Sequence, residues 1–273
     1  MTKLNIKIAF FDIDGTLTND NKEVLNSTIS ALNEASESGI KLALCSGRSH
    51  QYILKHSKLF KNIDYLISSN GARIFDVNND KNLYMDTLKD KDINNIWEQC
   101  NKNKLCLTIT GDKNAYINKF TKISNEDIYM KRINSLEDIL KENLYQLIVV
   151  NDNLNNMINL EKYLQNIKDI KLINYNFNYI NKKISNYYFF DIVNNNVSKG
   201  NAINILLKYL DIKKENTLCF GDSINDIDMF KSCGVKVAME NAIDSLKKES
   251  DFITDSNNND GISKFLNKYI LSD

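Results

Sequence analysis

The sequence lacks proline entirely and has only nine glycines among its 273 residues. This excludes proline-rich linkers and recognition segments, and it leaves Gly, Asn and Asp to make the turns. Asparagine is so frequent that turn signals outnumber the turns that the chain can contain. We therefore expect the order of helices and strands to be more secure than their ends.

Cysteine motifs and long apolar segments are also missing. The five cysteines form no CxxC pair and no zinc-ligand spacing, and their odd number argues against a disulfide framework. Cys45 and Cys219 lie in apolar runs, where packing is the expected role. The apolar run before Asp12 is too short for a signal peptide, and no segment has membrane-spanning length. We expect a cytoplasmic protein with no membrane partner.

Net charge is the third absence. Lys plus Arg and Asp plus Glu number 35 each, so the formal net charge at pH 7 is zero. Such a balance gives no reason to expect a nucleic acid or another polyanion as partner. A negatively charged substrate would have to be bound by a local site.

What is present is ordinary globular composition, with 42% hydrophobic and 26% charged residues. Short apolar runs alternate with amphipathic stretches at the start of the chain. They predict strands at residues 6–13, 40–45 and 64–68, and helices at 23–38 and 50–60. The strands are apolar throughout, as is typical of parallel strands buried on both faces.

The pattern changes in the middle of the chain. Residues 73–87 predict a hairpin that leaves the sheet, with a turn at Asn78-Asn79-Asp80. The next hundred residues mix the two kinds of element without regular alternation, which is typical of a separate α+β module. Helices are predicted at 90–101, 135–141 and 154–167, and strands at 105–109, 145–150 and 170–175.

The first pattern then resumes. Strands are predicted at 187–193, 217–220 and 235–238, and helices at 198–210 and 224–232, with two further helix signals, separated by residues 252–254, near the end. We predict an α/β protein. Its Rossmann-like parallel-sheet core would comprise residues 1–84 and 190–273, with an α+β cap domain, residues 85–189, inserted between them.

Asp12 and Asp14 follow the first apolar run, where open α/β sheets place their ligands. Two carboxylates about 4 Å apart repel by about 4 kcal/mol at an effective dielectric of about 20, so a cation such as Mg²⁺ would relieve the repulsion. A polar turn is the simpler explanation of this segment in isolation. A calcium loop fits poorly, because the EF-hand pattern needs further ligands before its glycine.

Two further candidates stand at the beginnings of predicted helices. Ser46 and Gly47 follow the second strand, where backbone amides and a hydroxyl could bind phosphate, although simple helix capping explains them equally well. Lys199 lies in the first turn of a helix, where its charge opposes the macrodipole. Its ammonium could neutralise a phosphoryl group together with Asp12, although most lysines are simply solvated.

An acidic cluster follows the strand at 217–220. Asp222 could be a metal ligand, Asn225 could bond phosphate, and Asp226 could orient Lys199 or a metal-bound water. Asp228 is assigned no more than a favourable position in the first turn of a helix.

All four elements fall at the same predicted sheet edge and, together, resemble the motifs of the haloacid dehalogenase superfamily. The resemblance is greatest to its Cof-type branch, subfamily IIB, the sugar-phosphate phosphatases. It rests on Asp12-Ile13-Asp14-Gly15-Thr16, Ser46, Lys199 and the segment from Gly221 to Met229. Ser69-Asn70-Gly71-Ala72 and Val237–Ala242 extend the resemblance, which covers the core, whereas the cap matches only in size and position.

The resemblance implies a phosphatase that hydrolyses small phosphate monoesters such as sugar phosphates, flavin mononucleotide or pyridoxal phosphate. Asp12 would form an aspartyl-phosphate, and Asp14 would act as general acid and base. Mg²⁺ would be held by the carboxylates of Asp12 and Asp222 and by the carbonyl oxygen of Asp14. The phosphate would be bound by the amide of Ile13 with four further residues, namely Ser46, Gly47, Lys199 and Asn225.

The cap is expected to close over the site, with hinges near residues 85–88 and 186–188. Trp97, Tyr116, Phe177 and Tyr179 could stack on a substrate, but the core of the cap is the expected place for each of them. Two other functions remain open. One is a phosphomannomutase-like phosphotransferase, and the other is a phospholigand-binding regulator on the same scaffold. The sequence does not indicate an oligomeric state.

Overall fold

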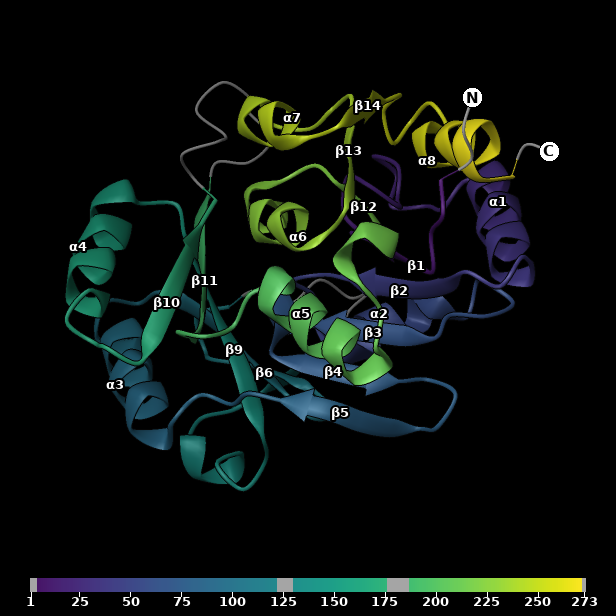
Figure 1. Ribbon diagram of the computed structural model, residues 1–273. Coiled ribbons are helices and arrows are strands. Elements are labelled where there is room, and N and C mark those ends of the chain that lie inside the picture. The colour runs from purple at the N-terminus through teal and green to yellow at the C-terminus, as the bar shows by residue number, and fades with distance from the viewer. Residues whose placement is uncertain (1–3, 122–129, 176–186, 272–273) are drawn as a thin grey trace. The chain divides into compact units, whose positions relative to one another are not determined.

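The computed structural model describes residues 4–121, 130–175 and 187–271 (Figure 1). The chain divides into two compact units. The first unit contains residues 1–48, 52–84 and 198–273, and the second contains residues 49–51 and 85–197.

The first unit is built on an eight-stranded sheet with the order β14-β13-β12-β1-β2-β3-β4-β5. All neighbours from β14 to β3 are parallel, and β4 is antiparallel to β3. The sheet is therefore the predicted α/β sheet with a parallel core. Its strands are β1 (Ile8–Phe11), β2 (Lys41–Cys45), β3 (Tyr65–Ser68), β4 (Arg73–Asp76), β5 (Lys81–Met85), β12 (Thr217–Gly221), β13 (Val235–Met239) and β14 (Phe252–Thr254).

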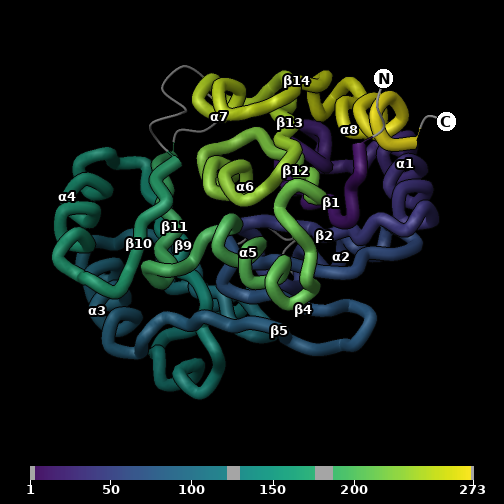
Figure 2. The backbone as a smooth tube through the Cα atoms, in the orientation of Figure 1, coloured from purple at the N-terminus to yellow at the C-terminus, as the bar shows by residue number. Residues whose placement is uncertain are grey.

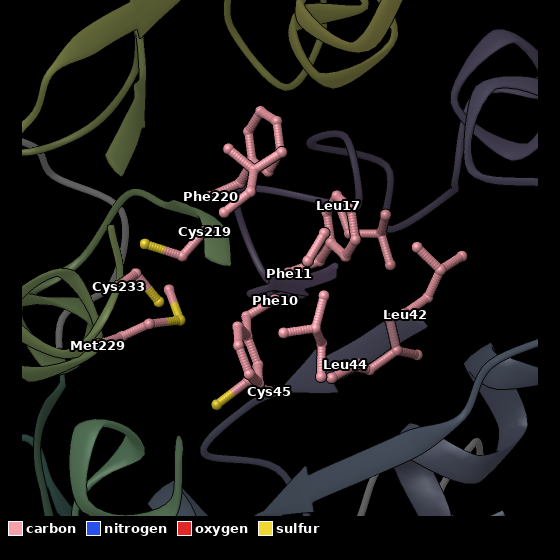
Figure 3. Close-up of a cluster of buried hydrophobic side chains, with 14 of the residues drawn as sticks. Phe10, Phe11, Leu17, Leu42, Leu44, Cys45, Cys219, Phe220, Met229 and Cys233 are labelled. Carbon is pink, nitrogen blue, oxygen red and sulfur yellow. The ribbon is translucent and has the colours of Figure 1, made fainter. Parts of the chain in front are cut away.

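The central strand β1 is buried along its whole length, because both of its faces are covered. Phe10 and Phe11 are fully buried, and the ring of Phe11 stacks on Phe220 of β12 at 5.3 Å between centroids. Figure 3 shows these rings among the side chains of the neighbouring strands, including Leu42 and Leu44 of β2. The three thiols of Cys45, Cys219 and Cys233 lie in the same cluster, and the first two have the packing position expected from the sequence.

The helices of the first unit cover the sheet in pairs, with α1 beside α8 and α5 beside α6 (Figure 2). Crossovers run from β1 to β2 in one direction and from β12 to β13 in the other, so the right-handed rule puts α1 and α6 on opposite faces. The strand order reverses at β1, where an open sheet forms its ligand crevice. The helices are α1 (Asn26–Glu37), α2 (His50–Ser57), α5 (Lys199–Leu210), α6 (Ile227–Ser232), α7 (Asp244–Glu249) and α8 (Gly261–Leu266).

One prediction for the first unit is wrong. The hairpin of β4 and β5 forms, but it extends the first sheet instead of leaving it. Ile74 pairs with Ile67, and Arg73 with Ser68, so β4 continues directly from β3. Side-chain alternation predicts a hairpin, whereas pairing with an outside strand depends on contacts that alternation does not encode.

The second unit has a six-stranded sheet with the order β10-β11-β9-β6-β7-β8, antiparallel except between β7 and β8. Two helices pack against it, and side chains such as Ile96 and Leu147 fill the core between them. Tyr116 belongs to this core, and the half-buried Trp97 packs against it. The elements are α3 (Asp90–Lys102), α4 (Leu154–Leu164), β6 (Cys106–Gly111), β7 (Ala115–Ile117), β8 (Met130–Arg132), β9 (Leu144–Asn151), β10 (Ile170–Asn174) and β11 (Tyr188–Asn194).

The structure corrects the predicted return of the chain to the core. The strand expected at 187–193 forms as β11, but it pairs with β9 and β10 in the second sheet. Residues 190–197 therefore lie in the second unit, not in a core segment beginning at residue 190. The helix expected at 135–141 is only a 3₁₀ turn, Leu136–Asp138, and the short strands β7 and β8 were not predicted.

Phe177, Tyr179 and residue 186 of the second expected hinge lie outside the described residues. Within the part of the chain that is described, none of the helices is both long and apolar enough to cross a membrane.

Candidate active site

The ends of β1 and β12 bring Asp12 and Asp222 together. Asp12 continues the pairing of the two strands, because its backbone N–H donates to the carbonyl of Phe220 at 3.1 Å. Thr16 donates its hydroxyl to Asp222 Oδ1 at 2.8 Å. Gly15 has φ +81°, and a Cβ built on it would lie 2.5 Å from Asp222 Oδ2. Only glycine lets the turn after β1 approach the Asp222 carboxylate this closely.

Lys199 is buried at the first turn of α5 and not solvated. Ser198 caps the helix by accepting a hydrogen bond from the N–H of Asn201 at 3.1 Å. The Lys199 ammonium donates to Asp12 Oδ1 and, at 2.6 Å, to Asp226 Oδ1. Burial alone would lower the pKa of Lys199, but these two carboxylates raise the pKa above its ordinary value.

Asp226 is fully buried, and both of its oxygens are engaged. Its Oδ2 accepts the backbone N–H groups of Asp222 and Ser223 at 3.0 and 2.9 Å, while Oδ1 accepts from Lys199. Ser223 and Asp226 also form the two halves of a capping box. Asp226 therefore holds both the loop after β12 and the ammonium group in place. Its neighbour Asp228 is half-exposed and lies near Lys231, away from this network.

The site carries more negative than positive charge. Asp12, Asp222 and Asp226 each offer a carboxylate oxygen within 4.8 Å of the others, whereas Lys199 contributes one ammonium. Burial raises the pKa of Asp12, with partial compensation from Lys199. Burial and the nearby carboxylate of Asp226 raise the pKa of Asp222 to about 7. A hard divalent cation would offset this charge, so the donor set fits one.

Asp14 lies outside this carboxylate group. Its two oxygens accept a bidentate pair of hydrogen bonds from Arg48, at 2.9 Å from Nε and 2.8 Å from Nη2. Burial would raise the pKa of Asp14, but the guanidinium brings the pKa below its ordinary value. The sequence did not indicate this partner, which is 34 positions away. The one sequence feature that could have suggested this partner is the arginine directly after Ser46-Gly47.

The loop after β2 brings Ser46 and Gly47 next to a segment that received no role from the sequence. Ser46 is buried, and its Oγ accepts the N–H of Arg48 at 3.2 Å. A Cβ on Gly47 would lie 3.0 Å from Oδ1 of Asn70. The same Oδ1 accepts a hydrogen bond from Asn225 Nδ2 at 2.9 Å. Asn70 therefore joins the second and fourth predicted motifs.

The remaining sequence predictions fall into the same region of the first unit. Ile13 is buried directly beside Asp12. Asn241, from the C-terminal segment of the resemblance, donates to the carbonyl of Gly15 at 2.7 Å. The first unit thus connects the predicted site residues through side chains that the sequence did not single out, chiefly Thr16, Arg48 and Asn70.

Comparison with known proteins identifies the family. Residues 9–266 match the family model of haloacid dehalogenase-like hydrolases. A Bacillus subtilis 5-amino-6-(5-phospho-D-ribitylamino)uracil phosphatase is 27% identical, with 98% of this chain and 97% of the relative covered. A Methanobrevibacter smithii phosphoglycolate phosphatase is 26% identical, with 98% and 100% covered.

Solved structures share the fold over nearly the whole chain. A haloacid dehalogenase-like hydrolase from Bacteroides thetaiotaomicron has a TM-score of 0.83 at 23% identity, with 96% of this chain and 99% of the other covered. A subclass IIB sugar phosphatase of the superfamily, BT4131, has a TM-score of 0.77 at 24% identity, with 96% and 98% covered. From its family match, its fold and its motifs, the chain belongs to the haloacid dehalogenase-like hydrolases.

Proposed function

We propose that this protein is a Mg²⁺-dependent phosphatase that hydrolyses small phosphate monoesters through an aspartyl-phosphate on Asp12. The observation that carries the proposal is the buried ammonium of Lys199 between Asp12 and Asp226, with Asp222 close by. An ammonium in this place keeps the Asp12 carboxylate oriented and offsets charge on an incoming phosphoryl group. The two relatives are both named as phosphatases, which supports the same reaction.

The reaction would proceed in two displacements. An Asp12 oxygen attacks phosphorus, the ester P–O bond breaks, and Asp14, in its protonated form, gives its proton to the departing alcohol oxygen. Water then attacks the same phosphorus, Asp14 takes a proton from that water, and the bond between phosphorus and Asp12 breaks. Orthophosphate leaves, and both aspartates return to their starting state.

Other residues of the first unit would bind the phosphate group and the metal ion and orient them. The Ile13 and Gly47 amides, the Ser46 hydroxyl, the Lys199 ammonium and the Asn225 amide group would surround the phosphate. The carboxylates of Asp12 and Asp222, with the Asp14 carbonyl oxygen, would hold Mg²⁺, which when bound supplies positive charge against the phosphate oxygens. Asp226 would support the site through its bonds to Lys199 and to the loop after β12.

Small phosphorylated metabolites are the proposed substrates. One relative is named for a phosphoribitylamino-uracil and the other for phosphoglycolate, so their phosphate esters differ widely in the organic part. We therefore place the reaction in the first unit and leave the choice of leaving group to the second unit, as the resemblance predicts. Sugar phosphates, flavin mononucleotide and pyridoxal phosphate form the first panel to test.

Release of orthophosphate from an aryl phosphate tests the proposal. Wild-type protein should release phosphate with Mg²⁺ and lose this activity with a chelator. Asp12→Asn should slow release by about 10⁴-fold or more, because the nucleophile is removed. Asp228→Asn is the matched control, since this half-exposed carboxylate lies outside the site and its loss should leave the rate unchanged.

Three results would contradict the proposal. One is equal activity of wild type and Asp12→Asn, and another is activity that a chelator does not affect. The third is phosphate transfer between sugar phosphates that exceeds hydrolysis, which would identify a phosphomannomutase-like enzyme. Circular dichroism of the variant would show that its fold is intact.

A further inference from the structure

Ser69, Asn70 and Gly71 have a backbone conformation that is unusual for three residues in succession. Their φ angles are +50°, +58° and +104°. All three residues are buried, and two of them carry a side chain in a region that non-glycine residues rarely occupy. Strain of this kind persists only where the surrounding structure requires it, and it is common at functional sites.

The segment Ser69–Gly71 contacts two of the loops that carry the predicted motifs through its backbone. The N–H of Ser69 donates to the carbonyl of Arg48 at 2.9 Å, and the N–H of Asn70 donates to that of Ser46 at 3.1 Å. On its other side, a Cβ added to Gly71 would collide with the Ser198 carbonyl, directly before Lys199. The strained backbone therefore fits between the loop after β2 and the start of α5.

The Asn70 side chain reaches a third loop. Its Oδ1 accepts one N–H of Asn225 Nδ2 at 2.9 Å, and it lies under the backbone of Gly47. An amide nitrogen has two N–H groups, so this bond fixes which end of the Asn225 side chain carries the donor and where its second N–H points. Asn70 itself is fully buried and cannot turn away without leaving this partner.

We propose that Asn70 is a positioning residue for phosphate binding, which it serves by holding Asn225 with its second N–H directed at a phosphate oxygen. The inference rests on the proposed function, because Asn225 contacts the phosphate only if that function is correct. The left-handed backbone at Asn70 is what aims its side chain at Asn225 and Gly47 at once.

The experiment compares Asn70→Gly, Asn225→Ala and the double variant, with an aryl phosphate as substrate and orthophosphate as inhibitor. Glycine keeps the left-handed backbone and removes the amide group. Asn70→Gly should raise KM and the inhibition constant of orthophosphate by about tenfold each, as expected for one hydrogen bond to a charged group. The kcat should change less than the KM. The double variant should resemble Asn225→Ala, because the two residues act as one unit.

Two further variants complete the design. Asn70→Asp has the same shape and can still accept from Asn225, but it places a negative charge near the phosphate, so orthophosphate binding should weaken further. Asp80→Gly is the control, because Asp80 also has a positive φ, +49°, and is exposed in the turn between β4 and β5. Its kinetic constants should match those of the wild type.

Wild-type kinetic constants in Asn70→Gly would overturn the inference. So would a double variant whose KM is raised by the product of the two single-variant factors. An equal fall in kcat and kcat/KM with a lower melting temperature would also overturn it, since that pattern shows a structural role only. If Asn70→Gly does not fold, Asn70→Ala, which also removes the acceptor for Asn225, takes its place in the same comparison. A wild type that releases no phosphate would refute the proposed function, and calorimetric orthophosphate binding to wild type and variants would still test Asn70.

Discussion

The two sheets of this protein bury their residues in different ways. In the first sheet, β1 and β12 are buried at every position, and the polar residues come at the ends of the strands. In the second sheet, the central strands β6 and β9 include half-buried positions, and polar side chains such as Thr108 and Gln146 occur within the strands. Parallel strands covered on both faces gather their chemistry at one edge, whereas antiparallel strands distribute polar groups over a face.

Ion pairs in the protein also differ in burial. Lys199 and its two carboxylate partners in the first unit are essentially inaccessible to solvent, and every charge has a defined partner. The pair of Lys89 and Asp169 in the second unit has side chains that are 61% and 55% exposed. Solvent weakens exposed pairs, which occur in both units, so the buried contacts of Lys199 should matter far more than the pair of Lys89 and Asp169.

The strongest test of this difference is Lys199→Met compared with Lys89→Met. Loss of the buried ammonium leaves Asp12 and Asp226 without compensation, which should cost about 3–5 kcal/mol in the free energy of unfolding. It should also slow phosphate release by at least about 100-fold. Lys89→Met should leave unfolding in denaturant and phosphate release unchanged. Equal effects of the two variants would mean that burial does not decide how much these ion pairs contribute.

A smaller effect is expected for Arg48→Ala, which removes the guanidinium paired with Asp14. If Arg48 holds the general acid in place, the loss should depend on the leaving group. Hydrolysis of an alkyl phosphate, which needs a proton donor, should slow by about 10-fold to 100-fold. Hydrolysis of 4-nitrophenyl phosphate should slow less, because nitrophenolate leaves without a proton. Equal slowing of both substrates would show that Arg48 does not act through Asp14.

The smallest effect concerns stability alone. Gln146 on β9 is fully buried, and neither amide atom has a hydrogen-bond partner among the described residues. Gln146→Leu should therefore raise the free energy of unfolding by about 1 kcal/mol, because it replaces two unsatisfied polar atoms with an apolar group of similar size. Gln146→Asn keeps the amide and serves as the control. Destabilisation by leucine would mean that the amide is satisfied in solution.

The first unit was largely predictable because its signals are local. An apolar run that ends in Asp12-Ile13-Asp14-Gly15-Thr16 indicates both a buried strand and the group at its end. The same holds for β2 with Ser46 and for β12 with Asp222. Parallel order then places those ends at one edge. Lys199 was identified because its charge is unfavourable at the start of a helix. The structure accounts for this position, since the side chain is buried between carboxylates and not solvated.

What was missed depends on contacts between distant segments. Alternation predicted β11 correctly as a strand, but nothing local indicates that it pairs with β9 and not with the first sheet. Likewise, Arg48 and Asp14 are 34 positions apart, and Asn70 and Asn225 are 155 apart. No periodicity connects such residues, and the resemblance included Ser69-Asn70-Gly71 without giving this segment a role.

The order of the strands has a consequence for synthesis on the ribosome. β2 follows β1 closely along the chain, but the other neighbour of β1, β12, is synthesised much later. Thr16 and its partner Asp222 are likewise 206 positions apart in the sequence. Until then, one edge of β1 is an unpaired apolar strand, a form that invites wrong pairing. We therefore expect chaperones to protect the nascent chain, and a product truncated before α5 to contain Asp12 without Lys199.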